Sequence, residues 1–359
     1  MGASGLHMAL KTKIPAKPDL HAVRRWLHVG LALVLLMLVV GAITRLTESG
    51  LSITEWKPVT GVLPPLNEAQ WQEEFKKYQA SPEFRYKNMT FTLTDFKTIY
   101  WWEWVHRLLA RLVGLVYIIP LTIFLWRRSI PGAYLPGILL IGVLGGLQGF
   151  LGWYMVKSGL VDEPRVSHYR LAAHLLTALT IAATIYWQSL RLSNFYNSRF
   201  QVQTAIRRHA ILALLVLIIQ IVYGAFVAGK DAGQLYNTWP RMGSEWIPEA
   251  VFASTPWYLN FLENEAGLQF IHRTLAWVVF LVMITLSFRL IFGKPAFLLW
   301  REGLWLLTLV VLQIVLGIFT LLMAVPIVLG VLHQLVAAWL LLVVVRIIFL
   351  TRKMSASAG

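Results

Sequence analysis

Four histidines of this sequence lie inside long apolar stretches, where ionisable side chains are rare. They are His106, His174, His272 and His333. A titratable group inside a membrane-length apolar segment costs about 3 kcal/mol or more unless it is paired or functional. For any one of them, a hydrogen-bonded packing role explains its presence as well as a chemical role does.

An internal repeat places the four histidines in corresponding positions. Residues 103–110 align with residues 269–276, so that His106 corresponds to His272. Further matches join Leu147-Gln148 and Leu151-Gly152 to Leu312-Gln313 and Leu316-Gly317, His174 to His333, and, more weakly, Gly41-Ala42 to Gly224-Ala225. The chain therefore reads as two halves with two histidines each. That arrangement favours one shared function over four separate packing roles.

Two imidazoles facing each other across a helix bundle suit heme iron, which takes one ligand above and one below a flat macrocycle. Zinc and di-iron sites usually add carboxylates, as in paired Glu-x-x-His motifs, and only one such motif is present, Glu103 to His106. The sequence has no cysteine, which excludes thiolate ligands, cysteine nucleophiles and disulfides. Two histidine pairs predict two heme sites. Arg107 and Arg273 would either reach heme propionates or extend to the membrane interface.

The two halves differ three residues before the first histidine of each pair. The first half has Glu103 there and the second has Gln269. Three residues are nearly one helical turn, so Glu103 shares a helix face with His106. A carboxylate can move protons or stabilise a developing cation, and an amide can do neither. This difference predicts a reaction site in the first half and an electron-relay site in the second, unless Glu103 is only an interfacial residue.

The composition predicts an all-α integral membrane protein. Of 359 residues, 57% are hydrophobic and only 14% are charged, too few charges for a soluble domain of this size. Eight stretches are long enough to cross a bilayer as helices, near residues 26–46, 104–126, 132–156, 169–190, 209–229, 267–291, 298–324 and 326–350. The last two meet in a tight turn at Ala324-Val325-Pro326.

Charge sets the expected topology. The net charge of +15 is concentrated in short connections between apolar stretches, which is typical of membrane orientation and argues against nucleic acid as a partner. Lys and Arg cluster at the ends that would face the cytoplasm, so both termini are expected inside and the histidines toward the periplasm. No removable signal peptide or mitochondrial leader is recognised, which favours a bacterial inner (plasma) membrane.

The expected organisation is two pseudo-symmetric four-helix bundles, related by an axis along the membrane normal. The segments are a cytoplasmic N-terminal segment 1–25, a first half 26–190 with a long outer loop 47–102, a cytoplasmic connection 191–208, a second half 209–350 with an outer loop 230–266, and a cytoplasmic tail 351–359. Tryptophans of the first outer loop would either cap the site or line the membrane surface.

His168 is expected to lie apart from the four histidines. It precedes His174 by six positions, about 9 Å along a helix, and would lie on a different helix face. A loop or interface position is therefore predicted for it.

An ordered set of motifs resembles the heme A synthase family of the proteobacterial and mitochondrial type. The motifs are residues 41–52, Glu55-Trp56-Lys57-Pro58, 61–65, 101–107, 169–174, 237–242 and 269–273, and they cover nearly the whole chain. The resemblance implies an eight-span enzyme that oxidises the C8 methyl group of heme O to a formyl group, giving heme A for cytochrome c oxidase. Some family members carry an outer-loop cysteine pair, which this chain lacks.

The same resemblance implies roles for the site residues. His272 and His333 would bind a heme b cofactor, His106 and His174 would bind the substrate heme, and Glu103 would be the leading catalytic residue. Oxidation would proceed through an alcohol and a hydrated aldehyde. Whether oxygen is activated at the iron or electrons are withdrawn stays open. The lipid bilayer, heme O synthase, an electron-transfer partner and oxidase assembly factors are the expected partners, and a homo-oligomer is left open.

Two other classes remain as alternatives. A diheme membrane electron-transfer protein, such as a quinol-linked cytochrome, would also use four histidines, although the common arrangement of two histidines about a dozen residues apart on one helix is absent. A heme carrier would explain the repeat but would not need Glu103 in one half only. Both alternatives would return the porphyrin unchanged.

Overall fold

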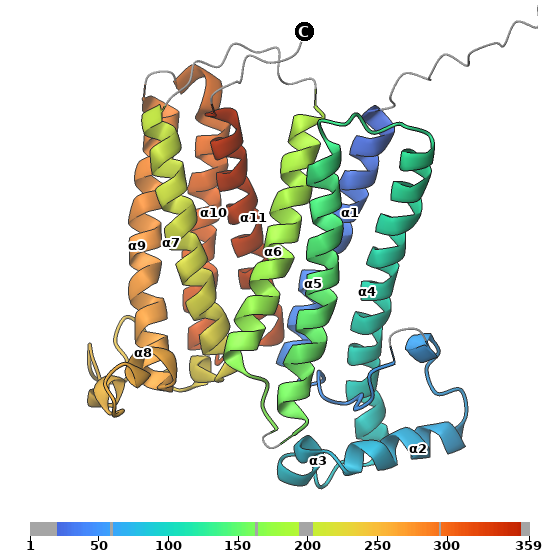
Figure 1. The fold of residues 1–359 in the computed structure, drawn as a ribbon. Coiled ribbons are helices and arrows are strands. Elements are labelled where there is room, and N and C mark those ends of the chain that lie inside the picture. The colour runs from blue at the N-terminus through green and yellow to red at the C-terminus, as the bar shows by residue number, and fades with distance from the viewer. Residues whose placement is uncertain (1–19, 58–59, 162–163, 194–203, 294–295, 353–359) are drawn as a thin grey trace, which may run out of the picture.

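Eight long helices form the body of the molecule (Figure 1). The structure is a computed structural model that describes residues 20–57, 60–161, 164–193, 204–293 and 296–352. The eight helices are α1 (Leu20–Leu46), α4 (Leu93–Trp126), α5 (Leu135–Gly159), α6 (His168–Arg191), α7 (Thr204–Gly229), α9 (Glu265–Phe292), α10 (Ala296–Leu322) and α11 (Ile327–Leu350). Each is long and apolar enough to cross a membrane, which confirms the predicted eight spans and the all-α class.

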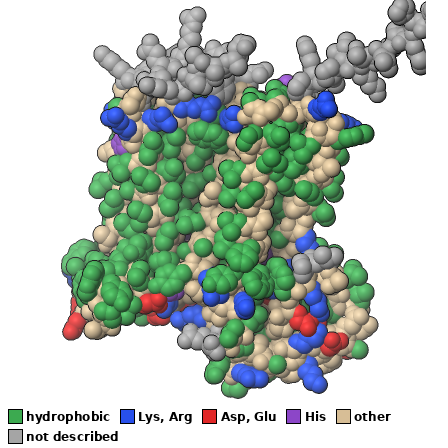
Figure 2. Space-filling view, viewed as in Figure 1, with side chains coloured by type: hydrophobic (Ala, Val, Ile, Leu, Met, Phe, Trp, Pro, Cys, Tyr) green, Lys and Arg blue, Asp and Glu red, His purple; other side chains and the backbone are tan. Residues whose placement is uncertain are grey.

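The outer surface of these helices suits a lipid environment. Large apolar side chains such as Leu115, Val143 and Leu281 are exposed on it, and hydrophobic side chains are spread over the middle of the face in Figure 2. Exposed apolar area of this extent is typical of a surface covered by lipid. The chain is a multi-pass membrane protein.

Each half of the chain forms a ring of four helices. In the first half, α1 contacts α4 and α6, and α5 contacts the same two helices. In the second half, α7 contacts α9 and α11, and α10 contacts the same two helices. The two rings lie side by side, with α6 and α1 against α7 and α11 (Figure 1). The two rings thus have the same order of neighbours, and a symmetry axis between them stays a prediction.

The two predicted outer loops fold into short helices at one end of the molecule (Figure 1). The first contains η1 (Thr60–Val62), α2 (Glu68–Gln79) and α3 (Pro82–Tyr86), and the second contains η3 (Ala232–Gln234), η4 (Glu249–Phe252) and α8 (Leu259–Leu262). Aromatic rings join α2 to α4: Tyr78 stacks on Phe96 at 5.1 Å, and Trp71 meets Tyr100 edge-on at 5.0 Å. This packing fixes the first outer segment above the ring.

Helix α4 begins well before the span predicted near residue 104. Thr92 and Asp95 form a capping box that begins the helix at Leu93. The first turns bury Phe96 and Tyr100 against α2 instead of facing lipid. Their mixed polar and aromatic sequence therefore gave no membrane signal, although the helix is continuous.

The turn between α10 and α11 is as tight as predicted. Ala324 and Val325 have φ values of 54° and 62°, and Pro326 precedes the first residue of α11. The predicted cytoplasmic segments 1–25, 191–208 and 351–359 lie largely outside the described residues.

Candidate functional site

One large cavity runs through both rings, and all four histidines line it. Its volume is about 1700 Å³, well above the ~300–1,000 Å³ of a typical single-ligand pocket. Within each ring the histidines come from alternate helices, His106 from α4 and His174 from α6, and His272 from α9 and His333 from α11. The structure therefore brings the four predicted ligands to a common cavity, two in each half.

Each histidine ring packs against a glycine of the preceding membrane helix. The pairs are Gly41–His106, Gly152–His174, Gly224–His272 and Gly317–His333, and a Cβ placed on these glycines would lie 3.0, 3.1, 3.1 and 2.9 Å from the ring Cε1. Such distances are too short for a methyl group without movement of the ring, so glycine is required for this close approach. The backbones of α1, α5, α7 and α10 thus set the positions of the imidazoles.

The donor set fits heme. Nδ1 of His106, His174 and His272 is buried without a hydrogen-bond partner among the described residues. Within the described ranges no three His, Cys, Asp or Glu side chains converge on a possible metal position. Imidazoles that stand singly suit a metal that brings its own equatorial ligands, as heme iron does.

Three glutamines that sequence reasoning did not assign to the site contact the imidazoles. Nε2 of Gln148 lies 3.2 Å from Nε2 of His174, and Nε2 of Gln313 lies 3.2 Å from Nε2 of His333. Nε2 of Gln220 lies 3.5 Å from Nε2 of His272. The internal repeat pointed to two of these glutamines because it matched Gln148 to Gln313. Repetition alone does not reveal which side chain a glutamine faces.

Glu103 is buried and fully hydrogen-bonded. Its side chain is 3% exposed. Oε1 accepts a 2.6 Å bond from Arg107, and Oε2 accepts 2.7 Å bonds from Ser52 Oγ and from the backbone N–H of Ile53. These donors hold the carboxylate at the cavity wall, and Glu103 in turn anchors the outer segment. Sequence spacing could not have found Ser52 and Ile53, since they lie about fifty positions away.

In the second half, Gln269 makes the complementary contact. Its Nε2 donates to the carbonyl of Tyr236 at 3.2 Å. Glu103 therefore receives a backbone N–H where Gln269 donates to a backbone C=O. The carboxylate in the first half and the amide in the second thus each match the backbone group that the outer segment presents. This match is additional to any chemical difference between the halves.

Arg107 and Arg273 both hold outer-segment backbone. Arg107 donates to the carbonyls of Ile53 at 2.9 Å and Glu55 at 3.1 Å. Arg273 donates to three carbonyls in the second outer segment, those of Tyr236, Thr238 and Arg241. Both residues also line the cavity. Contact with heme propionates stays a prediction.

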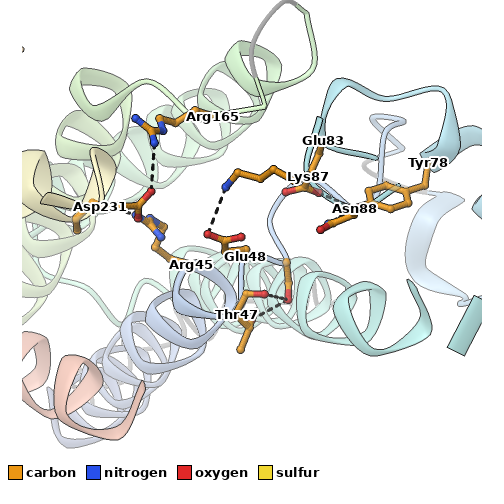
Figure 3. Close-up of polar contacts among 11 residues, drawn as sticks. Arg45, Thr47, Glu48, Tyr78, Glu83, Lys87, Asn88, Arg165 and Asp231 are labelled. Carbon is orange, nitrogen blue, oxygen red and sulfur yellow. Dashed lines mark hydrogen bonds and ion pairs between the residues drawn. The ribbon is translucent and has the colours of Figure 1, made fainter. Parts of the chain in front are cut away.

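Ion pairs join the two halves at the outer mouth of the cavity (Figure 3). Arg45, at the end of α1, pairs with Asp231 at 2.7 Å and also donates to the carbonyl of Ala228. Arg165 lies 3.8 Å from the second oxygen of Asp231. A further pair, Lys87 with Glu48 at 3.3 Å, lies within the first half. The mouth is therefore lined by both charge signs.

A buried carboxyl group lies beside this mouth. Glu83 is 3% exposed, and the hydroxyl of Tyr78 donates to its Oε2 at 3.1 Å. Asn88 donates to the same hydroxyl at 2.7 Å. Burial raises the pKa of Glu83 to about 7 and also raises the pKa of Tyr78.

The remaining residues weighed from the sequence occupy other places. His168 begins α6 and lies at the interface between the halves, with Nε2 2.9 Å from the carbonyl of Leu262 and its ring against Phe226. Trp56 lines the cavity, whereas Trp71 is buried in the aromatic packing between α2 and α4. Trp56 thus lies where a residue that caps the site was predicted, and Trp71 has neither of the two predicted roles.

Comparison with known proteins gives a consistent result. Residues 24–345 match the family described as cytochrome oxidase assembly protein. A heme A synthase from Parvibaculum lavamentivorans is 47% identical over 88% of this chain and 90% of its own length. Heme A synthases from Rhodopseudomonas palustris and Flavobacterium psychrophilum are each 44% identical, over 96% and 88% of this chain and 95% and 94% of their own lengths.

Proposed function

This chain belongs to the family of cytochrome oxidase assembly proteins, and we propose that it acts as a heme A synthase, a membrane oxidoreductase that converts heme O to heme A. The observation that carries the proposal is the similarity to heme A synthases along nearly the full length of both chains. This similarity weighs against the heme carrier and the diheme relay. The reaction would oxidise the C8 methyl group to a formyl group by way of an alcohol and a hydrated aldehyde.

We assign the second-half histidines to a resident heme b. His272 and His333 would hold it, and such a heme supplies one-electron transfer. The glycine contacts and the two glutamines Gln220 and Gln313 would keep both rings in place. Gln269 offers no acid or base beside this site.

We assign the first-half histidines to the substrate heme. His106 and His174 would orient it, and Glu103 would act on the methyl group being oxidised. Because three donors hold the Glu103 carboxylate in one position, the geometry supports a fixed negative charge that stabilises a developing cation more than a mobile proton carrier. Arg107 would position Glu103 through their ion pair.

We further propose the orientation in the membrane. Arg127, Arg191, Arg289 and Arg352 lie at the helix ends opposite the outer segments, and a band of Lys and Arg side chains is visible at that end in Figure 2. The positive-inside rule then places this end in the cytoplasm and the outer segments in the periplasm. A bacterial plasma membrane, supply of heme O by its synthase and delivery of heme A to oxidase assembly factors follow from the same assignment.

Chromatography with mass detection of hemes extracted from cells tests the activity. The chain would be produced together with heme O synthase in a host that makes no heme A. We expect heme A, or its C8 alcohol, to appear only when the chain is present. Unchanged heme O beside a folded, heme-loaded protein would overturn the proposal and favour the diheme relay.

A further inference from the structure

Three of the four imidazoles have a glutamine partner, and the fourth has a methionine in its place. Each partner stands four residues before the packing glycine on the preceding membrane helix: Gln148 before Gly152, Gln220 before Gly224, Gln313 before Gly317 and Met37 before Gly41. Residues four apart share a helix face, so each of these side chains is directed to the same histidine as its glycine. All four line the cavity.

The glutamines carry an acceptor that the histidines need. Oε1 of Gln148, Gln220 and Gln313 is buried without a partner among the described residues. The amide nitrogen of Gln313 already lies 3.3 Å from Nδ1 of His333. At His174 and His272 the amide nitrogen lies beside Nε2 instead, at 3.2 and 3.5 Å. A half-turn of each amide exchanges its oxygen and nitrogen, so the oxygen can accept the proton of the ring nitrogen that it faces and leave the other ring nitrogen for the iron.

That hydrogen bond would favour iron binding. A metal-bound histidine almost always donates its second ring N–H to an acceptor, which fixes the tautomer and ring orientation and makes the nitrogen a stronger ligand. Loss of such a partner typically lowers metal affinity about 10- to 100-fold. The glutamines therefore fit the role of positioning residues for His174, His272 and His333.

Met37 cannot supply this contact. A thioether is at most a weak acceptor and has no N–H. Nδ1 of His106 has no hydrogen-bond partner in the part of the chain that the structure describes, and the same holds for His174 and His272, so His106 differs from them in the residue at the glutamine position. The second-half pair thus has a glutamine for both histidines, and the first-half pair has one for His174 only.

We propose that Met37 makes His106 the exchangeable axial ligand of the first-half site. The assignment of substrate to this half rests on the proposed function. A substrate heme that must leave as product needs at least one ligand that releases readily, whereas a resident heme is better served by two firmly held ligands. The difference at position 37 supplies this distinction without moving either histidine.

Heme transfer from the full-length protein tests the proposal. The protein is reconstituted with hemin, and loss of heme to excess apomyoglobin is followed over time. We expect a fast phase from the first-half site and a slow phase from the second. Met37→Gln should slow the fast phase about 10- to 100-fold relative to Met37→Leu, which matches its size but has no amide. Equal fast-phase rates in these two variants would overturn the proposal.

Absorption spectra and a second variant complete the test. Met37→Gln should increase the six-coordinate low-spin signal of the ferric protein, which a change in packing alone would not do. If Met37→Gln fails to fold, Gln313→Met decides: the slow phase should accelerate about 10- to 100-fold, and an unchanged slow phase would contradict the positioning role. Neither rate depends on heme oxidation, so failure to make heme A would overturn the proposed function alone.

Discussion

Glu103 and Arg107 form a 2.6 Å ion pair one turn apart on α4, and both side chains also bind the backbone of the outer segment at Ile53. The pair thus connects the cavity wall to the segment above it. A substitution at Glu103 will affect both the chemistry and the attachment of this segment, and the two effects need separate measurements.

Glu103→Gln should lower heme A formation about 100-fold or more, because the amide lacks the charge that would stabilise a cation. Bound heme b should be retained. Product would be measured by chromatography of extracted hemes. Asp95→Asn is the control, since it weakens the capping box of the same helix without touching the cavity. Full activity in Glu103→Gln with heme bound would contradict the catalytic role.

Removal of individual histidines should distinguish the two halves. His272→Ala and His333→Ala should lose the proposed heme b, because each removes one of the two residues that would hold it. His106→Ala and His174→Ala should retain heme b but fail to produce heme A. The heme content of purified protein and the extracted product are both measured. Loss of heme b from the first-half variants with their fold intact would reverse the assignment.

Gly152→Ala should disturb His174. A Cβ at this position would lie 3.1 Å from Cε1 of His174, so the ring must shift and heme binding in the first half should weaken about 10-fold or more. Gly132→Ala provides the comparison, because a Cβ there meets nothing within 4 Å and the residue is not part of the cavity lining. Hemin titration of both variants measures the effect, and equal affinities would show that the close contact is not needed.

Glu83 should make stability depend on pH. Its pKa of about 7 in the folded protein lies above the ordinary value of 4.5, so the folded state holds this proton more tightly than the unfolded state does. Stability should therefore fall as pH rises from about 4.5 through 7, by on the order of 3 kcal/mol. Thermal unfolding at pH 5 and pH 8 measures this change. The change should be smaller in Glu83→Gln, and an equal slope in both proteins would exclude Glu83 as its source.

Much of the fold could be predicted because the membrane imposes a strong pattern on sequence. The eight spans, the turn at Ala324-Val325-Pro326 and the placement of two histidines in each half follow from hydropathy, backbone preferences and an internal repeat. That all four histidines line one cavity was not predicted. The start of α4 could not be read in this way, since its first turns bury Phe96 and Tyr100 against another helix.

Contacts between distant segments were beyond sequence reasoning. Ser52 approaches Glu103 only because the outer segment folds back over α4, and neither residue type nor spacing encodes that path. The glutamine contacts are an intermediate case: Gln148 and Gln313 were visible as a repeated pair, but their histidine partners depend on how α5 and α10 face α6 and α11.

The glycine contacts also bear on how a duplicated protein acquires two functions. Since the backbone at Gly41, Gly152, Gly224 and Gly317 sets where the imidazoles stand, the placement of ligands is separate from the side chains around them. Single replacements at neighbouring positions, such as Met37 or Glu103, can then alter how one half binds or oxidises a porphyrin. The backbone positions that place the histidines stay the same. Two copies of one architecture can in this way diverge into a reaction site and an electron-relay site while the helices keep their arrangement.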